Sequence, residues 1–314
     1  MEDINMEKLI VSSSPHIHGK ASTQTIMRDV LIALAPATVA AVVLFGLKAL
    51  IMICTCVAAS VLSEFIFNKL AKKETTVGDL SAVVTGLLLA LNLSTNVTLW
   101  QCLVGSVFAI VVVKCAFGGL GYNFANPAIT ARVMLLVAFT EVSGGAMTQF
   151  AELASGATPL EVIKSGTGKL PSMLDMLLGN RGGAIGETCA IALVLGGVYL
   201  IVRKVISWHT PVVYVGSVFL LSLLIKQDVS VALYEILGGG LLIGAFFMAT
   251  DYVTTPKRPL GKVVFALGCA LLTVLIRFFG VYPEGVSFAI LIMNILTPFI
   301  DKMCKRKPFG GAKA

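Results

Sequence analysis

Residues 49–68 read ALIMICTCVAASVLSEFIFN, an apolar run with a single charged side chain. In helical form, about 20 such residues cross the hydrocarbon core of a bilayer. Nine further apolar segments occur, at about 26–46, 79–95, 97–117, 127–140, 185–203, 210–225, 231–251, 262–280 and 286–302. Only 13% of the 314 residues are charged, against about a quarter in soluble domains. We therefore predict an all-α polytopic membrane protein with about ten transmembrane helices.

Some of these segments, 79–95 and 127–140 among them, are shorter than the ~20 residues that a full crossing needs. Gly, Asn or Pro residues interrupt or bound them. Broken helices are tolerated at membrane depth only where they lie against protein or line a cavity. The short segments therefore indicate where a binding site lies.

The two halves of the chain resemble each other weakly. Residues Asp29–Leu34 match Glu187–Ala192 at an offset of 158, and Thr85–Ala90 match Gly239–Gly244 at an offset of 154. Lys114 and Arg277 each precede a Phe-Gly turn and are separated by 163 residues. The nearly constant offset predicts a five-plus-five duplication. Because each half has an odd number of spans, we expect the second half to be inverted in the membrane.

Basic residues predict the orientation. With the N-terminus inside, 18 of the 24 Lys and Arg residues fall on the inner side and 6 on the outer side, as expected when positive loops stay in the cytoplasm. The predicted units are a cytoplasmic tail (1–25), a first repeat (26–140), an outer loop (141–184), a second repeat (185–302) and a basic cytoplasmic tail (303–314). Residues 1–25 contain no apolar core of a signal peptide, so no cleaved leader is expected.

Several functions find no support in the composition. The net charge of +7 reflects the inside-positive pattern and gives no reason to expect nucleic acid. Seven Cys residues without a C-x-x-C pair, and only three His residues, predict no metal or iron–sulfur site. No G-x-G-x-x-G element follows a predicted strand, so we expect NADH to react elsewhere.

Two acidic residues, Asp79 and Glu235, lie near the starts of the third and eighth segments. Acidic side chains at membrane depth are costly and often mark an ion route. A carboxylate at a helix N-terminus also has a purely structural explanation, because the helix dipole stabilises it. The sequence leaves both interpretations open.

The stretch Phe117-Gly118-Gly119-Leu120-Gly121-Tyr122-Asn123-Phe124-Ala125-Asn126-Pro127 joins the fourth and fifth segments. A tight turn explains part of it, with Asn126 as N-cap and Pro127 in the first turn of the next helix. Asn123, three glycines and two aromatic residues also suit a planar polar ligand such as an isoalloxazine ring. Turn and ligand site remain alternatives here.

A polar stretch rich in Ser, Thr and Gly, 141–183, contains Ser155-Gly156-Ala157-Thr158-Pro159-Leu160. Thr158 suits a helix N-cap, with Glu161 completing a capping box. Its hydroxyl, between small neighbours on a loop, also suits modification by an enzyme as a phosphoester. The two interpretations are compatible.

The stretch Glu152-Leu153-Ala154-Ser155-Gly156-Ala157-Thr158 resembles the flavinylation motif of the membrane subunits of two redox-driven ion pumps. These are the Rnf complex (ferredoxin to NAD) and the sodium-pumping NADH:quinone reductase. Glu152 stands where the motif usually has Asp. Ser13–His16, Thr25–Met27, Ala33–Pro36 and the 118–127 cluster are similar to further family signatures. The resemblance covers essentially the whole chain. The length of the chain favours the membrane subunit of the Rnf complex over that of the quinone reductase.

The resemblance implies FMN attached covalently to Thr158, within the motif Ser155, Gly156 and Ala157. It also implies a second, non-covalent flavin, a riboflavin in the related pump, with Asn123 and Asn126 as contacts. The implied protein is one electron carrier in a bacterial inner-membrane complex that drives Na⁺ or H⁺ across, incomplete as an enzyme alone. Its implied partners are other subunits, a flavin transferase and lipid. A secondary transporter or channel for a small solute is the alternative.

Overall fold

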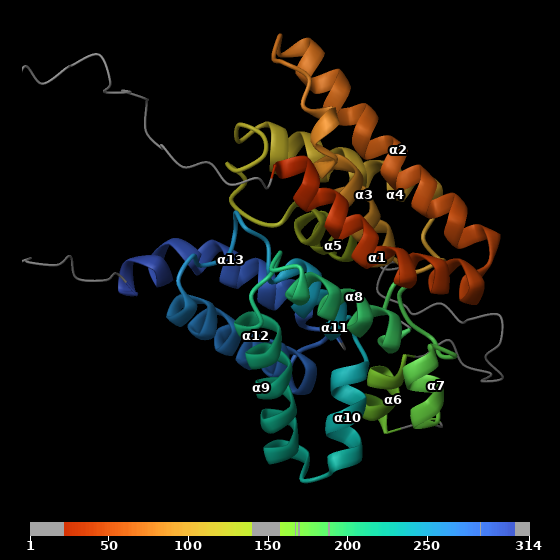
Figure 1. Ribbon diagram of the computed structural model, residues 1–314. Coiled ribbons are helices and arrows are strands. Elements are labelled where there is room, and N and C mark those ends of the chain that lie inside the picture. Colours follow the sequence, from red (N-terminus) through yellow and green to blue (C-terminus); the bar gives the residue numbers. More distant parts are fainter. Residues whose placement is uncertain are drawn as a thin grey trace, which may run out of the picture.

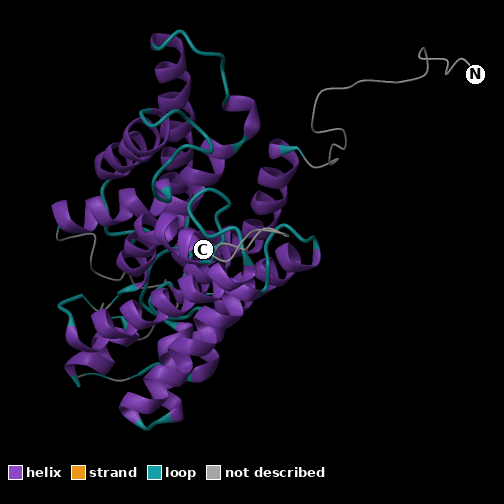
Figure 2. Cartoon of the chain, turned by 90° about the vertical axis from the view of Figure 1, so that its left-hand side faces the viewer, coloured by secondary structure: helices purple, strands orange, loops and turns teal. Residues whose placement is uncertain are grey.

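The computed structural model describes residues 22–139, 158–166, 168, 170–187, 189–282 and 284–304. Every regular element named within these ranges is a helix (Figure 2). Residues 140–157, which include Ser155, Gly156 and Ala157, lie outside the described residues, as do the two predicted tails except for residues at their inner ends.

Ten helical units match the ten predicted segments. They are α1 (Thr23–Phe45), α2 (Leu47–Leu70), α3 (Ser81–Leu91), α4 with the π-helix η3 (Leu99–Val107, Phe108–Cys115), α5 (Pro127–Ala138), α8 (Ala190–Val202), α9 (His209–Lys226), α10 with α11 and the π-helix η5 (Val229–Leu237, Leu241–Ile243, Gly244–Met248), α12 (Pro259–Phe279) and α13 (Val286–Met303). Short elements lie between them: η2 (Val77–Asp79), α6 (Pro159–Ser165) and α7 (Met173–Leu178).

Five helices are long and apolar enough to cross a membrane: α1, α2, α9, α12 and α13. Taken together, α10 and the α11–η5 segment are long and apolar enough for a sixth crossing, with a bend of 60° at a break of three glycines. Gly239 and Gly240 adopt φ values of 64° and 67°, which only glycine adopts without strain. The remaining four units, including α3 and α5, are shorter apolar helices. The prediction of a polytopic protein with short and broken helices is confirmed.

The two halves pack in the same way (Figure 1). In the first half α2 packs against α3 and α4, and in the second α9 packs against α10 and α12. Lys114 at the end of η3 donates to Ser81 of α3, and Arg277 at the end of α12 donates to Glu235 of α10. Ser81 and Glu235 are separated by 154 residues, the same offset as between the glycine-containing matches in the sequence. The structure thus supports the duplication.

The first helices of the two halves, α1 and α8, run antiparallel against each other. Asp29, near the start of α1, accepts a hydrogen bond of 3.1 Å from Arg203, the C-cap of α8. Ala33, one turn further along α1, contacts Gly196, which lies about two turns earlier in α8. Equivalent helices with opposite directions are what an inverted repeat produces.

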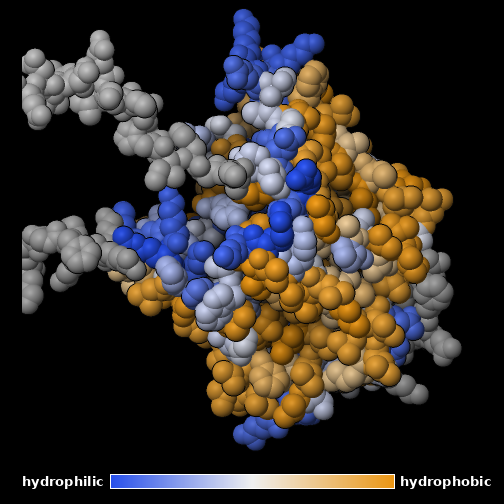
Figure 3. All heavy atoms as spheres, viewed as in Figure 1, coloured by the Kyte–Doolittle hydropathy of each residue, from blue (hydrophilic) through white to orange (hydrophobic). Residues whose placement is uncertain are grey.

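Large apolar side chains cover much of the surface (Figure 3). Only 28–44% of the residues in the most apolar windows of the five long helices are buried. Such an apolar exterior suits lipid chains and not water. The start of α1 and the end of α13 lie on the same side of the molecule (Figure 1). The chain is therefore a multi-pass membrane protein.

Candidate functional site

Thr158 is the N-cap of α6. Its Oγ1 accepts from the Glu161 amide at 3.3 Å, and Glu161 Oε2 accepts from the Thr158 amide at 2.8 Å. The predicted capping box is confirmed. Thr158 is only 3% exposed, so α6 holds the motif threonine against the body of the protein.

The helix α6 docks on the break between α10 and α11. The Leu160 side chain fills the space beside Gly238 and Gly239. The Lys164 ammonium donates to three carbonyl oxygens just beyond the end of α12, those of Gly280, Val281 and Tyr282, at 2.5, 3.1 and 3.3 Å. A cation there satisfies carbonyls left without partners where a helix ends. Leu160 and Lys164 thus fix Thr158 relative to the broken span.

Glu235 forms a buried ion pair with Arg277 directly beneath α6. Its Oε2 lies 2.8 Å from Arg277 Nη1, and both residues are 3% exposed. Arg277 also donates to the carbonyls of Glu235, Gly238 and Gly239. It therefore satisfies backbone oxygens freed at the C-terminal end of α10. Glu235 lies in the second turn of α10, further inside the span than its sequence position indicated.

Asp79 has the structural role expected of a carboxylate beside a helix N-terminus. Its Oδ1 accepts from the amide and hydroxyl of Ser81, at 2.8 and 2.5 Å, in the first turn of α3. Ser81 in turn accepts from Lys114, which pairs with Glu64 at 2.8 Å. Asp79 and Glu235 thus belong to corresponding ionic clusters of the two repeats and do not meet. Their predicted part in an ion route remains a prediction.

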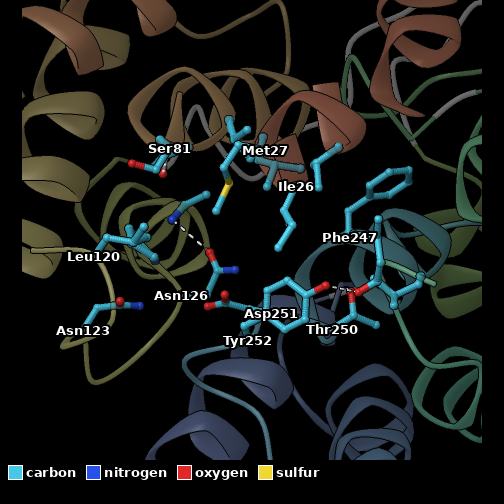
Figure 4. Close-up of a pocket in the computed structure, with 18 of the residues that line it drawn as sticks. Ile26, Met27, Ser81, Leu120, Asn123, Asn126, Phe247, Thr250, Asp251 and Tyr252 are labelled. Carbon is cyan, nitrogen blue, oxygen red and sulfur yellow. Dashed lines mark hydrogen bonds between the residues drawn. The ribbon is translucent and has the colours of Figure 1, made fainter. Parts of the chain in front are cut away.

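Asn123 and Asn126 form the predicted turn. The Asn123 amide donates to Ala125 O at 3.0 Å, and Asn126 Oδ1 caps α5 by accepting from Ala128 N and Ile129 N at 3.1 and 3.3 Å. Both side chains also line a cavity, with the Asn126 Nδ2 directed toward its centre (Figure 4). The geometry therefore accommodates both interpretations of this cluster.

The cavity is partly open to solvent, and its space for water-sized molecules is about 100 Å³. Ile26, Met27 and Phe247 form apolar wall, and Asp251 and Tyr252 lie near the asparagines (Figure 4). Small-molecule sites have this character, a mostly apolar wall with a few placed polar groups. The position of Asp251 and Tyr252 in this cavity could not be predicted from the sequence, because only the fold brings the loop after η5 against the Asn126 turn.

Four cations that the sequence placed at the membrane surface are buried inside the protein. Lys114, Arg132, Arg181 and Arg277 are at most 4% exposed. Buried carboxylates and carbonyl oxygens hold them, from residues distant in sequence. Removing all four from the charge count leaves the inner side strongly favoured.

Fold and site together define a multi-pass membrane protein built from an inverted repeat, with a polar helix break inside its eighth span and a partly polar cavity beyond the end of that span. The model of the NQR2, RnfD, RnfE family matches residues 10–310, and the chain belongs to that family. The predicted membership of this family is thereby confirmed.

Individual relatives align over nearly their whole lengths. The D subunit of the Na(+)-translocating ferredoxin:NAD(+) oxidoreductase complex of Acetobacterium woodii is 47% identical over 99% of this chain and 98% of its own. The D subunit of the proton-translocating ferredoxin:NAD(+) oxidoreductase complex of Clostridium ljungdahlii is 42% identical over 96% of each. The D subunit of the ion-translocating oxidoreductase complex of Halorhodospira halophila is 34% identical over 95% and 94%.

Proposed function

We propose that this chain is the equivalent of the D subunit in an ion-translocating ferredoxin:NAD⁺ oxidoreductase complex, and that it carries FMN as a phosphoester on Thr158. The observation that carries the first part is the full-length similarity to relatives so named. The second part is supported by the motif threonine, which stands at a fixed position beside the broken eighth span. Because one relative is named for Na⁺ and the other for protons, the proposal covers either ion.

The geometry of Thr158 is compatible with a phosphoester. The described bond to its Oγ1 is long, at 3.3 Å, against about 2.9–3.0 Å for a typical N–H···O bond. Esterification at Oγ1 therefore removes only a weak hydrogen bond. The shorter bond from the Thr158 amide to Glu161 does not involve the hydroxyl, so half of the capping box persists. Since Thr158 is buried, we expect the flavin transferase to act before α6 docks on the break.

A second flavin, a riboflavin, is proposed for the cavity at Asn123 and Asn126. The Asn126 Nδ2 supplies a donor for a polar ring edge, and Ile26, Met27 and Phe247 supply apolar wall. The two sites lie at opposite ends of the α11–η5 unit: Gly239 contacts α6, and Thr250 lines the cavity. The eight helical residues Leu241–Met248 span about 12 Å, so this unit joins both sites directly.

Bound flavins would supply the electron-carrying chemistry that side chains lack. The residues of this chain position them. Thr158 anchors one, Leu160 and Lys164 hold that anchor on the helix break, and Asn126 faces the other. The inside-positive charge pattern supports a location in the bacterial cytoplasmic membrane with both termini in the cytoplasm and Thr158 on the outer face. The start of α1 and the end of α13 lie on the same side of the molecule, as cytoplasmic termini require. Other complex subunits, the transferase and lipid are the partners.

Flavin fluorescence of the denatured subunit in a gel tests the covalent attachment. The wild type from a host with the transferase is expected to fluoresce, and Thr158→Val is expected to be dark. Ser230→Ala, at an exposed hydroxyl in the first turn of α10, is the control and should remain fluorescent. A dark wild type would refute the attachment. Solute flux through the purified subunit would then favour the transporter alternative.

A further inference from the structure

Three buried arginines and three glutamates surround the α10–α11 break. Two of the glutamates are paired: Glu235 with Arg277, and Glu284 with Arg132. The third, Glu187, lies in the turn that precedes α8 and is 3% exposed. Neither oxygen of its carboxylate has a hydrogen-bond partner among the residues that the structure describes.

The backbone of the Glu187 turn is fixed although its carboxylate is not. The amides of Ile185 and Gly186 donate to the carbonyls of Leu93 and Leu91, at 2.9 and 2.7 Å, at the end of α3. Arg181 Nη2 donates to the carbonyl of Glu187 at 2.9 Å. This arginine therefore holds the main chain of Glu187, and its own Nε and Nη1 have no partner within the described residues.

The space beside the Glu187 carboxylate is formed by glycines. A Cβ on Gly183 would stand 2.6 Å from Oε1. A Cβ on Gly240, in the helix break, would stand 3.4 Å from Oε2 and 3.5 Å from Arg132 Nη1. The carboxylate thus faces the break itself, and the Arg132 guanidinium approaches the same position beside Gly240.

An ionised carboxylate buried without hydrogen bonds is costly, and a proton removes that cost. Glu284 carries a negative charge nearby and favours the protonated form, while Arg181 and Arg132 favour the ionised form. The other charged groups of the cluster, Arg277 of α12 and Glu235 of α10, neutralise each other. Cys189 lies near Arg181. The charges around Glu187 therefore act in opposite directions on its protonation, so neither the protonated nor the ionised form is strongly excluded.

We propose that Glu187 is a proton-binding site at the α10–α11 break, in exchange with water through Glu284. This inference rests on the proposed ion-translocating function and deepens it. The bond that forms and breaks is the O–H bond of the Glu187 carboxyl. Because no described residue bonds the Glu187 carboxyl group, a water molecule carries the proton to Glu284 as Glu187 ionises, and Glu284, whose side chain is 16% exposed, releases it to solvent.

The chemistry around Glu187 favours a proton over a metal cation. Hard cations need several oxygen ligands, whereas the charged neighbours here include the guanidinium groups of Arg132 and Arg181, which repel a cation. A proton needs only the carboxylate. The site is also linked to the flavin-bearing helix, because Arg181 donates to Leu237 O at 2.6 Å at the end of α10, next to the glycines that Leu160 contacts.

Infrared difference spectra of the purified complex, recorded as pH is varied, test the proposal. We expect the carbonyl stretch of a protonated, buried carboxylic acid to titrate in the wild type and to be absent in Glu187→Gln. Glu74→Gln, at an exposed loop residue, is the control and should retain the band. Glu187→Asp keeps a titratable acid and should retain a shifted band, which separates loss of the acid from a folding defect.

In reconstituted vesicles, Glu187→Gln is expected to lower ion pumping by about a hundredfold, the lower limit of what a positioned proton-transfer group contributes. Superimposable spectra of wild type and Glu187→Gln at every pH would overturn the proposal, as would unchanged pumping. Gel fluorescence of the same preparation separates the two hypotheses. A dark subunit with a titrating carboxyl refutes only the flavin, and a fluorescent subunit without one refutes only the proton site.

Discussion

Replacing Arg277 by Met should be one of the most destabilising single changes in this protein. The substitution keeps the volume of the side chain but strands Glu235 as a buried charge. Removing one partner of a buried pair costs about 3–5 kcal/mol. Arg277 also serves three backbone carbonyls at the end of α10, and each lost bond to a charged donor adds about 1.5–3 kcal/mol at most.

The reverse change, Glu235→Gln, should cost clearly less than Arg277→Met. Gln can still accept from Arg277, and the arginine keeps its three carbonyl partners. The double variant Glu235→Gln with Arg277→Met removes the stranded charge. We therefore expect it to be more stable than Arg277→Met alone, although it still lacks the donors to the carbonyls.

These differences can be measured as the midpoint temperature at which heating in detergent removes the monodisperse complex. A cost of about 3–5 kcal/mol corresponds to a fall on the order of ten degrees in the midpoint. Arg258→Met, at a partly exposed cation that precedes the first residue of α12, is the matched control and should change the midpoint little. Equal losses in the two single variants, or additive losses in the double variant, would refute the assignment of Arg277 as the group that satisfies the helix break.

Three further substitutions test other parts of the structure. Gly86→Leu should prevent assembly of the first repeat, because a Cβ at Gly86 would stand 2.8 Å from Cys56 O and Val57 Cα of α2; normal yield of the folded subunit would contradict this packing. Asn126→Ala should cost about 1 kcal/mol through loss of the α5 cap and release non-covalent flavin, whereas Asn126→Ser keeps a cap and should lose only the flavin; retention of that flavin in both would exclude Asn126 as a contact. Asp29→Asn should cost less than about 1 kcal/mol, because Arg203 is 51% exposed and its pair is solvent-screened; a large drop in the thermal midpoint would show that this pair holds α1 on α8.

The sequence was most informative where the physical signal is local. Apolar runs located all ten helical units, because each must bury or expose its own surface to lipid irrespective of its partners. Pro127 and Thr158 correctly marked helix starts, since caps depend on neighbours within one turn.

What depends on distant partners could not be predicted. Lys114 reads as a loop cation until the fold brings Glu64 to it from fifty residues away. Arg132 pairs with Glu284 across 152 residues. Asp251 and Tyr252 join the cavity only because the inverted repeat places the end of η5 against the α4–α5 turn. No spacing within the chain encodes these contacts.

The mass of one tryptic peptide tests the covalent attachment of FMN most directly. Cleavage after Arg132 and Lys164 releases residues 133–164, which include Thr158. From native membranes, we predict this peptide to be heavier by one FMN less one water, with fragmentation placing the addition on Thr158. Recovery of the same peptide in full amount and at its unmodified mass would contradict the attachment.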